Sequence, residues 1–136
     1  MRKFVGIMVT MAILLSFSGF SSWAEGIAPQ YIHIDRITAS LSISGGVATC
    51  SGQAKPSSDA VTSHITLKLQ QKDGNTWKAV ASWSGSASKP GGSAVVTGTK
   101  TLIKGNAYRV VAYAIMKDAD NNIVENGSYI GDEKTY

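Results

Sequence analysis

The chain has 136 residues, the size of a single domain, and carries 13 Lys and Arg against 9 Asp and Glu, for a formal net charge of +4. The basic residues are spread singly along the sequence, without aromatic residues interleaved among them, so the charge does not indicate nucleic-acid binding. The single cysteine excludes an intramolecular disulfide and a Cys-rich zinc site.

The N-terminal segment has the composition of a secretory signal peptide. Two basic residues precede an apolar run from Phe4 to Phe20, and the small residues Ser22 and Ala24 follow it. This order predicts a signal peptide helix over residues 1–24, whose removal leaves residues 25–136 as one exported domain. Because the run is close to the lower limit for a membrane-spanning helix, about 17 residues, an uncleaved membrane anchor is the alternative.

Strand patterns dominate the chain after residue 31. Residues 37–44 alternate apolar side chains with Ser and Thr, which predicts a strand with one apolar face and one hydroxyl face. Gly45 and Gly46 form a turn into a second predicted strand at residues 47–54, which ends before Lys55 and Pro56. We expect Cys50, among small apolar neighbours in that strand, to be a buried small hydrophobe and not a reactive thiol.

The middle of the chain predicts a β-hairpin. Residues 65–70 alternate apolar and polar side chains, an Asp-Gly-Asn turn follows, and residues 76–84 form the return strand. If that strand is regular, Trp77 and Trp83 share one face and form a candidate ligand surface for a sugar or a peptide. A bulge in the strand would separate the two rings, and large aromatic residues also commonly cover a sandwich core.

Three more strands are predicted in the C-terminal half. A Gly-, Ser- and Pro-rich loop at residues 85–93 is followed by a strand at 94–102 and by an almost continuously apolar, and therefore central, strand at 108–117. A turn at 118–122 precedes the last strand at 123–130. Seven short strands without an amphipathic helix after the leader predict an all-β, seven-stranded antiparallel sandwich.

One segment carries a fold-specific pattern. From Leu102 the sequence fits Leu-x-x-Gly-x-x-Tyr-x-Val, with Gly105 and Tyr108 at the fixed positions. It resembles the tyrosine corner of immunoglobulin-like and fibronectin-type-III-like sandwiches, in which a Tyr at the start of the sixth strand bonds its hydroxyl to upstream backbone. The resemblance implies structural roles for these residues and for Cys50, while Val110 stands where an antibody-type domain has its second cysteine.

A second resemblance covers nearly all of the chain after the leader. It rests on residues 37–50, 67–72, 77–83 and 105–110, which are similar to a family of short secreted proteins from Gram-positive, Clostridia-type bacteria. The resemblance implies a bacterial source and a sandwich fold, and it implies no activity.

The sequence contains no pattern typical of an enzyme active site or a metal centre. His33 and His64 have no metal-ligand partner at helical or hairpin spacing. Residues 118–122 begin like a calcium loop, but Ile123 replaces the required Gly, which excludes an EF-hand and leaves a weak oxygen-lined Ca²⁺ site as the alternative to a plain turn. We therefore expect no catalytic residue, no metal and no cofactor.

These patterns do not identify a specific function. Because sandwiches carry binding on loops and exposed faces, we expect a secreted, non-catalytic module whose partner is an extracellular protein or glycan, with no nucleic acid and no stable membrane insertion after cleavage. The alternative is a structural or envelope-associated protein that self-associates or keeps its anchor. A small hydrolase is disfavoured, because no nucleophile, base and oxyanion donors can be assembled from the sequence.

Overall fold

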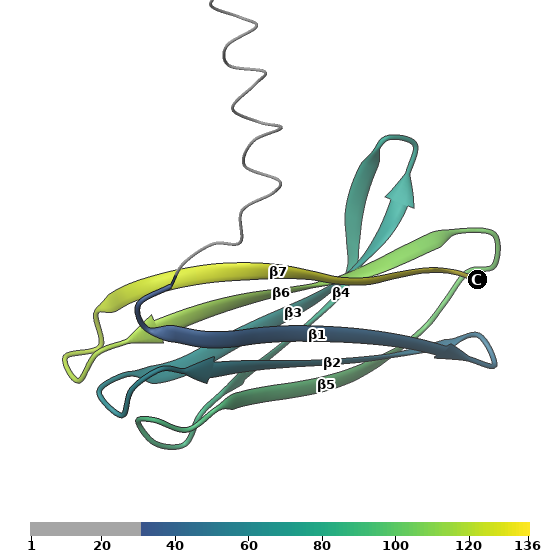
Figure 1. The fold of residues 1–136 in the computed structure, drawn as a ribbon. Coiled ribbons are helices and arrows are strands. Elements are labelled where there is room, and N and C mark those ends of the chain that lie inside the picture. The colour runs from purple at the N-terminus through teal and green to yellow at the C-terminus, as the bar shows by residue number, and fades with distance from the viewer. Residues whose placement is uncertain (1–30) are drawn as a thin grey trace, which may run out of the picture. The chain divides into compact units, whose positions relative to one another are not determined.

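The computed structural model describes residues 31–136, so the predicted signal peptide lies outside the described residues. Two antiparallel sheets pack face to face, which confirms the all-β, two-sheet class predicted from the sequence (Figure 1). In the described part, no helix is long and apolar enough to cross a membrane. The strands are β1 (Ile34–Ser44), β2 (Val47–Pro56), β3 (Thr62–Asp73), β4 (Thr76–Ser86), β5 (Ala94–Thr101), β6 (Ala107–Lys117) and β7 (Ile123–Thr135).

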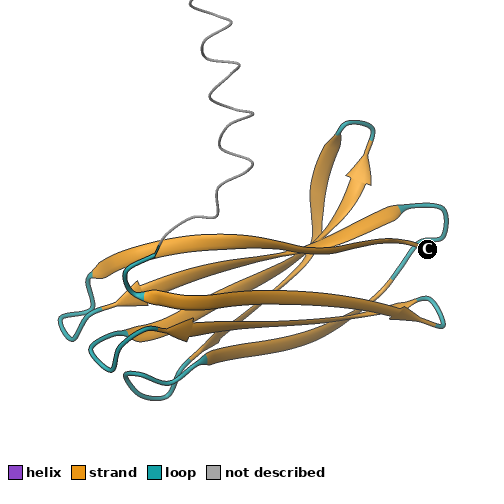
Figure 2. Cartoon of the chain, in the orientation of Figure 1, coloured by secondary structure: helices purple, strands orange, loops and turns teal. Residues whose placement is uncertain are grey.

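The strand order divides the chain between a three-stranded and a four-stranded sheet. The first sheet has the order β1-β2-β5 and the second the order β4-β3-β6-β7. Three hairpins, β1–β2, β3–β4 and β6–β7, stay within one sheet, while the other connections cross between the sheets. Consequently the loops gather at the two ends of the sandwich, and the far part of the β3–β4 hairpin stands away from the body (Figure 2).

The core lies between the sheets and follows the period of two in the sequence. On β3, Ile65, Leu67 and Leu69 are buried while the residues between them are half-buried. On β6, Val110 and the other inward apolar residues are buried, and Val111 is buried on the outer face as well. β6 lies between β3 and β7 in the sheet. The prediction that this strand is central is therefore confirmed.

The two sheets approach each other closely along both edges. Where β4 meets β5, the indole of Trp83 covers Gly98, and a Cβ atom at Gly98 would overlap the ring. Where β7 meets β1, Gly131 packs against the backbone carbonyl of Ala39. Glycine at these positions allows a contact that any side chain would block.

A bulge in β4 overturns the predicted common face of the two tryptophans. Leu69 pairs with Ala81 and Gln70 with Ala79, so Val80 is the extra residue in the ladder. From this point the side chains change faces: Trp83 packs against the core, whereas Trp77 pairs with the outward Lys72. β4 is therefore not a regular strand, and the rings of Trp77 and Trp83 do not form one ligand surface.

Several strand ends differ from the prediction. β2 continues through Pro56, which pairs with Ile34 beside an irregularity of the ladder, a place where proline is tolerated. β3 begins at Thr62, and β7 continues to Thr135 because it pairs with β6 along its length. β5 ends at Thr101, since the next amide, that of Leu102, donates to the carbonyl of Gly46.

Candidate binding face

The outer face of the four-stranded sheet carries a cluster of cations and aromatic rings. In the ladder, Lys68 pairs with Val111, Gln70 with Arg109 and Lys72 with Trp77, and paired residues point to the same side of a sheet. These side chains lie opposite the buried Leu67 and Leu69 of the same strand. We use the name cationic–aromatic face for Lys68, Lys72, Trp77, Arg109 and Tyr113.

Each cation of this face lies over an aromatic ring. The Arg109 guanidinium carbon is 4.4 Å from the centre of the Trp77 ring, and the Lys72 ammonium nitrogen is 5.9 Å from the same centre. The Lys68 ammonium lies 5.5 Å from the centre of the Tyr113 ring. The ring quadrupole attracts such cations and holds their long side chains along the sheet surface.

An apolar patch accompanies the cations. Val111 is only 3% exposed although it lies on the outer face and is not part of the core between the sheets. Its neighbours Tyr113 and Ile130 are 39% and 57% exposed. This face therefore combines a covered aliphatic residue, accessible rings and positive charge, a composition suited to recognition.

The outer face of the three-stranded sheet is chemically different. Its middle is a grid of hydroxyl side chains in register across β1, β2 and β5, and the Ser40 and Ser51 hydroxyl oxygens lie 2.8 Å apart. Lys55 pairs with Asp35 near one end, at 3.7 Å. The hydroxyl residues are Thr38, Ser40, Ser42, Ser44, Thr49, Ser51, Thr97, Thr99 and Thr101.

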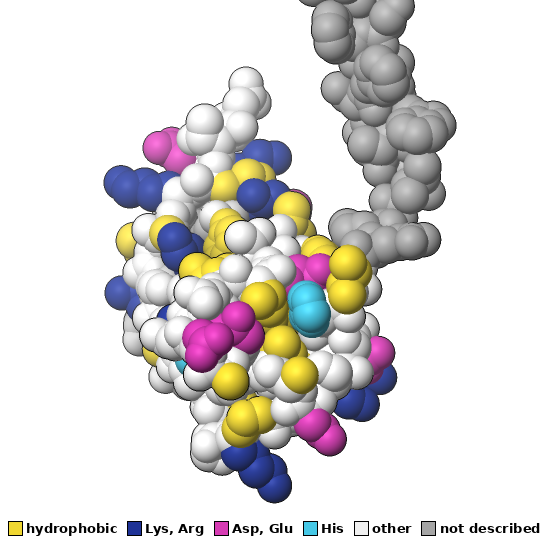
Figure 3. Space-filling model, turned by 90° about the vertical axis from the view of Figure 1, so that its left-hand side faces the viewer, with side chains coloured by type: hydrophobic (Ala, Val, Ile, Leu, Met, Phe, Trp, Pro, Cys, Tyr) yellow, Lys and Arg dark blue, Asp and Glu magenta, His cyan; other side chains and the backbone are white. Residues whose placement is uncertain are grey.

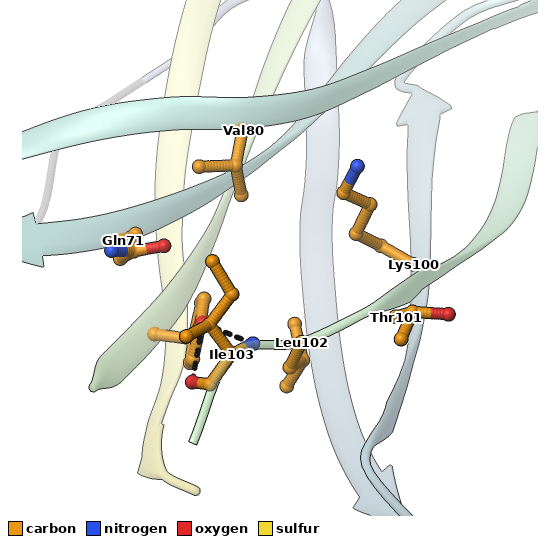
Figure 4. A pocket seen from close by; sticks show the side chains of 7 residues that line it. Gln71, Val80, Lys100, Thr101, Leu102 and Ile103 are labelled. Atoms are coloured by element: carbon orange, nitrogen blue, oxygen red, sulfur yellow. Dashed lines mark hydrogen bonds between the residues drawn. The ribbon is translucent and has the colours of Figure 1, made fainter. Parts of the chain in front are cut away.

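A cavity opens where the β3–β4 hairpin leaves the body of the sandwich (Figure 4). It has a volume of about 260 Å³ and lies between the hairpin residues Gln71 and Val80 and the segment from Lys100 to Ile103. Tyr108 forms part of its wall, and its hydroxyl is engaged with the backbone of Ile103. The cavity is half open and mostly apolar, so it can take one small apolar group.

Charge is unevenly distributed along the molecule. The end of the sandwich that carries the tip of the β3–β4 hairpin, called the hairpin end, holds six cationic and three acidic residues. The opposite end holds four cationic and five acidic residues. Figure 3 faces that opposite end, where apolar side chains lie among acidic ones. The cations at the hairpin end are Lys72, Lys78, Lys100, Lys104, Arg109 and Lys134, and the acids are Asp73, Asp132 and Glu133.

The two histidines lie apart from each other. His64 is on β3, with its Nδ1 atom 2.8 Å from the Ser86 hydroxyl, and burial together with the nearby Lys117 lowers the pKa of His64. His33 precedes β1, and its backbone amide donates to Glu125 at 2.7 Å. The pairing of His64 with Ser86 was not predicted, because it depends on the β3–β4 register.

Metal-binding geometry is absent from the described residues. Across residues 31–136 no three His, Cys, Asp or Glu side chains gather as ligands. In the turn before β7, an Asp118 carboxylate oxygen accepts the backbone amides of Asp120 and Asn122 at 2.9 Å each. That oxygen is occupied by an Asx turn, the ordinary use of aspartate at such a place.

Three of the four residues expected to have structural roles lie at one end of the core, and the fourth, Cys50, lies within β2. The Tyr108 hydroxyl donates to the Ile103 carbonyl at 2.9 Å and accepts the Ile103 amide at 3.0 Å. Leu102 is buried, and Gly105 has a φ of 94°, a conformation that favours glycine. Cys50 is fully buried on β2, and burial raises the pKa of its thiol to about 11.

Sequence reasoning missed most of the cationic–aromatic face. Lys68, Lys72 and Arg109 read as solvated strand residues, and only Trp77 was named as a candidate for ligand contact. A signal was present in the alternation of residues 66–72, which places the lysines on the outward side of β3. The partners of these lysines come from β4 and β6, so their identity requires the strand register.

No protein-family model and no curated protein matches the chain. The sporulation control protein Spo0M from Bacillus subtilis aligns over 77% of this chain and 49% of its own, with 15% identity and a TM-score of 0.45, so this chain spans about half of that protein. CsgH of R. palustris aligns over 68% of this chain and 86% of its own, with 13% identity and a TM-score of 0.40. A Bacteroides uniformis beta-glucuronidase aligns over 71% of this chain and 13% of its own, with 14% identity and a TM-score of 0.43.

Proposed function

We propose that this chain is a secreted, non-catalytic immunoglobulin-like module that binds an extracellular protein or glycan through its cationic–aromatic face. The observation that carries the proposal is the gathering of three cations over two rings on the outside of one sheet. The middle of the opposite outer face consists of hydroxyl residues. Such a difference between two exposed faces favours one of them as the binding surface.

The immunoglobulin-like assignment is supported by the strand order and by Tyr108. Three strands, β1-β2-β5, face four strands, β4-β3-β6-β7, as two antiparallel layers. Tyr108 starts the sixth strand and bonds its hydroxyl to Ile103 upstream, as the tyrosine of a tyrosine corner does. Cys50 and Val110, at the places of an antibody-type disulfide, are both buried.

The proposed compartment is extracellular, including the cell surface. The order of charged, apolar and small residues over residues 1–24 supports export with cleavage before residue 25. The resemblance of the sequence to short secreted proteins of Clostridia-type bacteria also supports an extracellular location. An uncleaved leader would instead hold the module at the membrane.

Binding is favoured over catalysis by the position of the reactive side chains. The Ser86 hydroxyl and the His64 imidazole are in contact, but they lie on an open strand face and outside the cavity. A nucleophile needs a site that excludes water and presents oxyanion donors, and an open face does not provide it.

The test is co-sedimentation of the purified protein with isolated envelopes of the producing cell. We expect saturable pelleting that Lys68→Glu weakens, because the substitution reverses a charge in the middle of the cationic–aromatic face. Lys89→Glu is the matched control, since it makes the same charge change in the β4–β5 loop. Complete recovery of the wild-type protein in the supernatant would refute envelope binding, and equal loss in both variants would refute the assigned face.

A second candidate function, self-association, is favoured by β7. This edge strand exposes four large apolar residues, Ile123, Val124, Tyr129 and Ile130. Exposed apolar edge strands are templates for pairing with another chain. Sedimentation velocity over a hundredfold concentration range tests this function: a mass that rises with concentration and falls in Ile130→Lys supports it, and a constant monomer mass excludes it.

A further inference from the structure

We infer that Arg109 and Lys72 form an oxyanion site beside Trp77 that takes carboxylate or phosphate groups of an acidic glycan. This inference rests on the proposed function and names the chemistry of its ligand. It assigns a defined pair of cations within the wider cationic–aromatic face, and it requires an acidic partner where the proposed function allows a neutral one.

Two cations, Arg109 and Lys72, lie near one aromatic ring, and neither takes part in an ion pair with another described residue. Arg109 and Lys72 come from different strands, β6 and β3, yet both lie over the Trp77 ring, at 4.4 and 5.9 Å. Within residues 31–136 the ion pair is Lys55 with Asp35, so neither of the two cations forms an ion pair with a carboxylate. Glu133 is the register partner of Arg109 but forms no ion pair with it. Two cations that lie near one ring and form no ion pair in the described part of the chain can attract an anion.

The Arg109 guanidinium is held in place while its terminal nitrogens remain available. Arg109 Nε donates to the Gln70 side-chain oxygen at 2.7 Å, and the guanidinium carbon lies 4.4 Å from the centre of the Trp77 ring. The bond uses one of the five N–H donors, which leaves the two terminal NH₂ groups for a ligand. A carboxylate or a phosphate can accept two of these bonds at once, and a preordered arginine loses little entropy on binding.

The rest of the face indicates the kind of polymer. Lys68 provides a further cation along β3, over Tyr113. Beyond Lys68 the same face offers neutral hydrogen-bonding groups, including the Thr66 and Ser84 hydroxyls, which are 3.2 Å apart. Sugar hydroxyls match such groups. Nucleic acid is less well matched, because single strands stack successive bases on aromatic rings, and here a cation lies over each of the two rings.

The test measures binding of two acidic polymers and one neutral polymer to the whole protein. Polygalacturonate supplies carboxylates, poly(glycerol phosphate) supplies phosphates, and dextran is the neutral control. We expect one or both acidic polymers to bind, with affinity that falls at least tenfold between 50 and 300 mM salt, and dextran not to bind. Because the anion would lie beside Trp77, binding should change the indole fluorescence, and Trp77→Phe should abolish the change.

Variants locate the site. Arg109→Gln and Lys72→Gln should each weaken the acidic polymer about tenfold or more, since each removes one charge-assisted contact. Lys89→Gln, which removes a charge at the opposite end, should bind as the wild type does. Lys72 is exposed on the hairpin, so its variant tests the site even if Arg109→Gln folds poorly.

Two results would overturn the inference and leave the proposed function standing. The first is envelope binding that neither salt nor the Arg109→Gln and Lys72→Gln substitutions weaken. The second is tighter binding to dextran than to either acidic polymer. Tighter binding to single-stranded oligothymidine would instead overturn both the inference and the proposed function, which names a protein or glycan as the partner. If the protein binds neither envelopes nor any of these polymers, the proposed function fails together with the inference.

Discussion

Tyr108 stabilises the end of the core because its hydroxyl group both donates and accepts a hydrogen bond. Because the ring is 1% exposed, removing the hydroxyl leaves the amide and carbonyl of Ile103 with poorer partners. We expect Tyr108→Phe to lower the free energy of unfolding by about 1–3 kcal/mol, measured by urea denaturation. Tyr129→Phe is the control, since that ring is largely exposed, and it should change stability by less than about 0.5 kcal/mol. Equal effects would show that the hydroxyl bonds of Tyr108 do not stabilise the fold.

Glu125 ties the start of β1 to β7. Its carboxylate accepts the backbone amides of Ile32, His33 and Ile34 at 2.9, 2.7 and 2.9 Å. Burial acts to raise the pKa of Glu125, but the three amide bonds and the charge of His33 outweigh it, so the pKa is lowered. A lowered pKa in the folded state means that the ionised group stabilises the fold above the ordinary pKa of glutamate. That stabilisation is lost as the pH falls through the lowered value.

We therefore expect Glu125→Gln to destabilise the protein by about 1–2 kcal/mol at neutral pH, because a neutral amide is a weaker acceptor than a carboxylate. The difference from the wild type should shrink in acid, where the wild-type carboxylate is protonated. Urea denaturation at several pH values measures both effects. Glu133→Gln makes the same charge change on β7 without the amide bonds, and an equal loss in that variant would contradict the role of Glu125.

At the scale of elements, the strands were predictable and the bulge was not. The alternation on β3 and the apolar run of β6 indicate which residues are buried, so the all-β class, the succession of strands along the chain and much of the core follow from local patterns, whereas the order of the strands within each sheet does not. The sequence of β4 does not reveal that Val80 is the extra residue, because either register of the strand would bury small or aromatic residues. The position of Trp77 depends on that bulge, and so does the site around it.

Most residues of the candidate site could not be predicted from the sequence, for a related reason. An isolated lysine on a strand has the same sequence signature whether it points into water or lies over a ring. Arg109 is on β6 and Trp77 is on β4, and β3 lies between these two strands. The Arg109 side chain reaches across β3 to the Trp77 ring, and its guanidinium donates to Gln70 of β3. Contacts between three strands are set by long-range pairing, which local patterns do not encode.

The contact between β4 and β5 gives a test of how the sheets meet. Trp83 covers Gly98, where an added methyl group would overlap the indole. We expect Gly98→Ala to lower the free energy of unfolding by about 1–3 kcal/mol through overpacking. In a Trp83→Leu background the same substitution should cost at least about 0.5 kcal/mol less, because the smaller side chain leaves room for the methyl group. Additive effects in the double variant would show that the two residues do not compete for one space.

For the whole molecule, a closed body and one projecting hairpin predict two levels of local stability. The sheets meet at both edges, so β6 should open only when the whole body unfolds. The tip of the β3–β4 hairpin has mostly exposed residues and stands away from the body of the sandwich (Figure 1). Native-state hydrogen exchange should therefore show amides of residues 74–78 opening at far lower free energy than those of residues 110–114.

Ligand binding should protect the hairpin together with the core. An anion held by Lys72 and Arg109 would tie the hairpin to β6, so saturating acidic polymer should slow exchange in the hairpin by at least tenfold. Exchange in β6 should slow as well, because β6 exchanges through global opening and the ligand binds only the folded protein. Lys72→Gln should remove the protection. Equal hydrogen-exchange protection of the hairpin and of β6 in the free protein would contradict the prediction that the projecting hairpin opens at lower free energy. Unchanged hairpin exchange in a saturated complex would place the ligand elsewhere on the molecule.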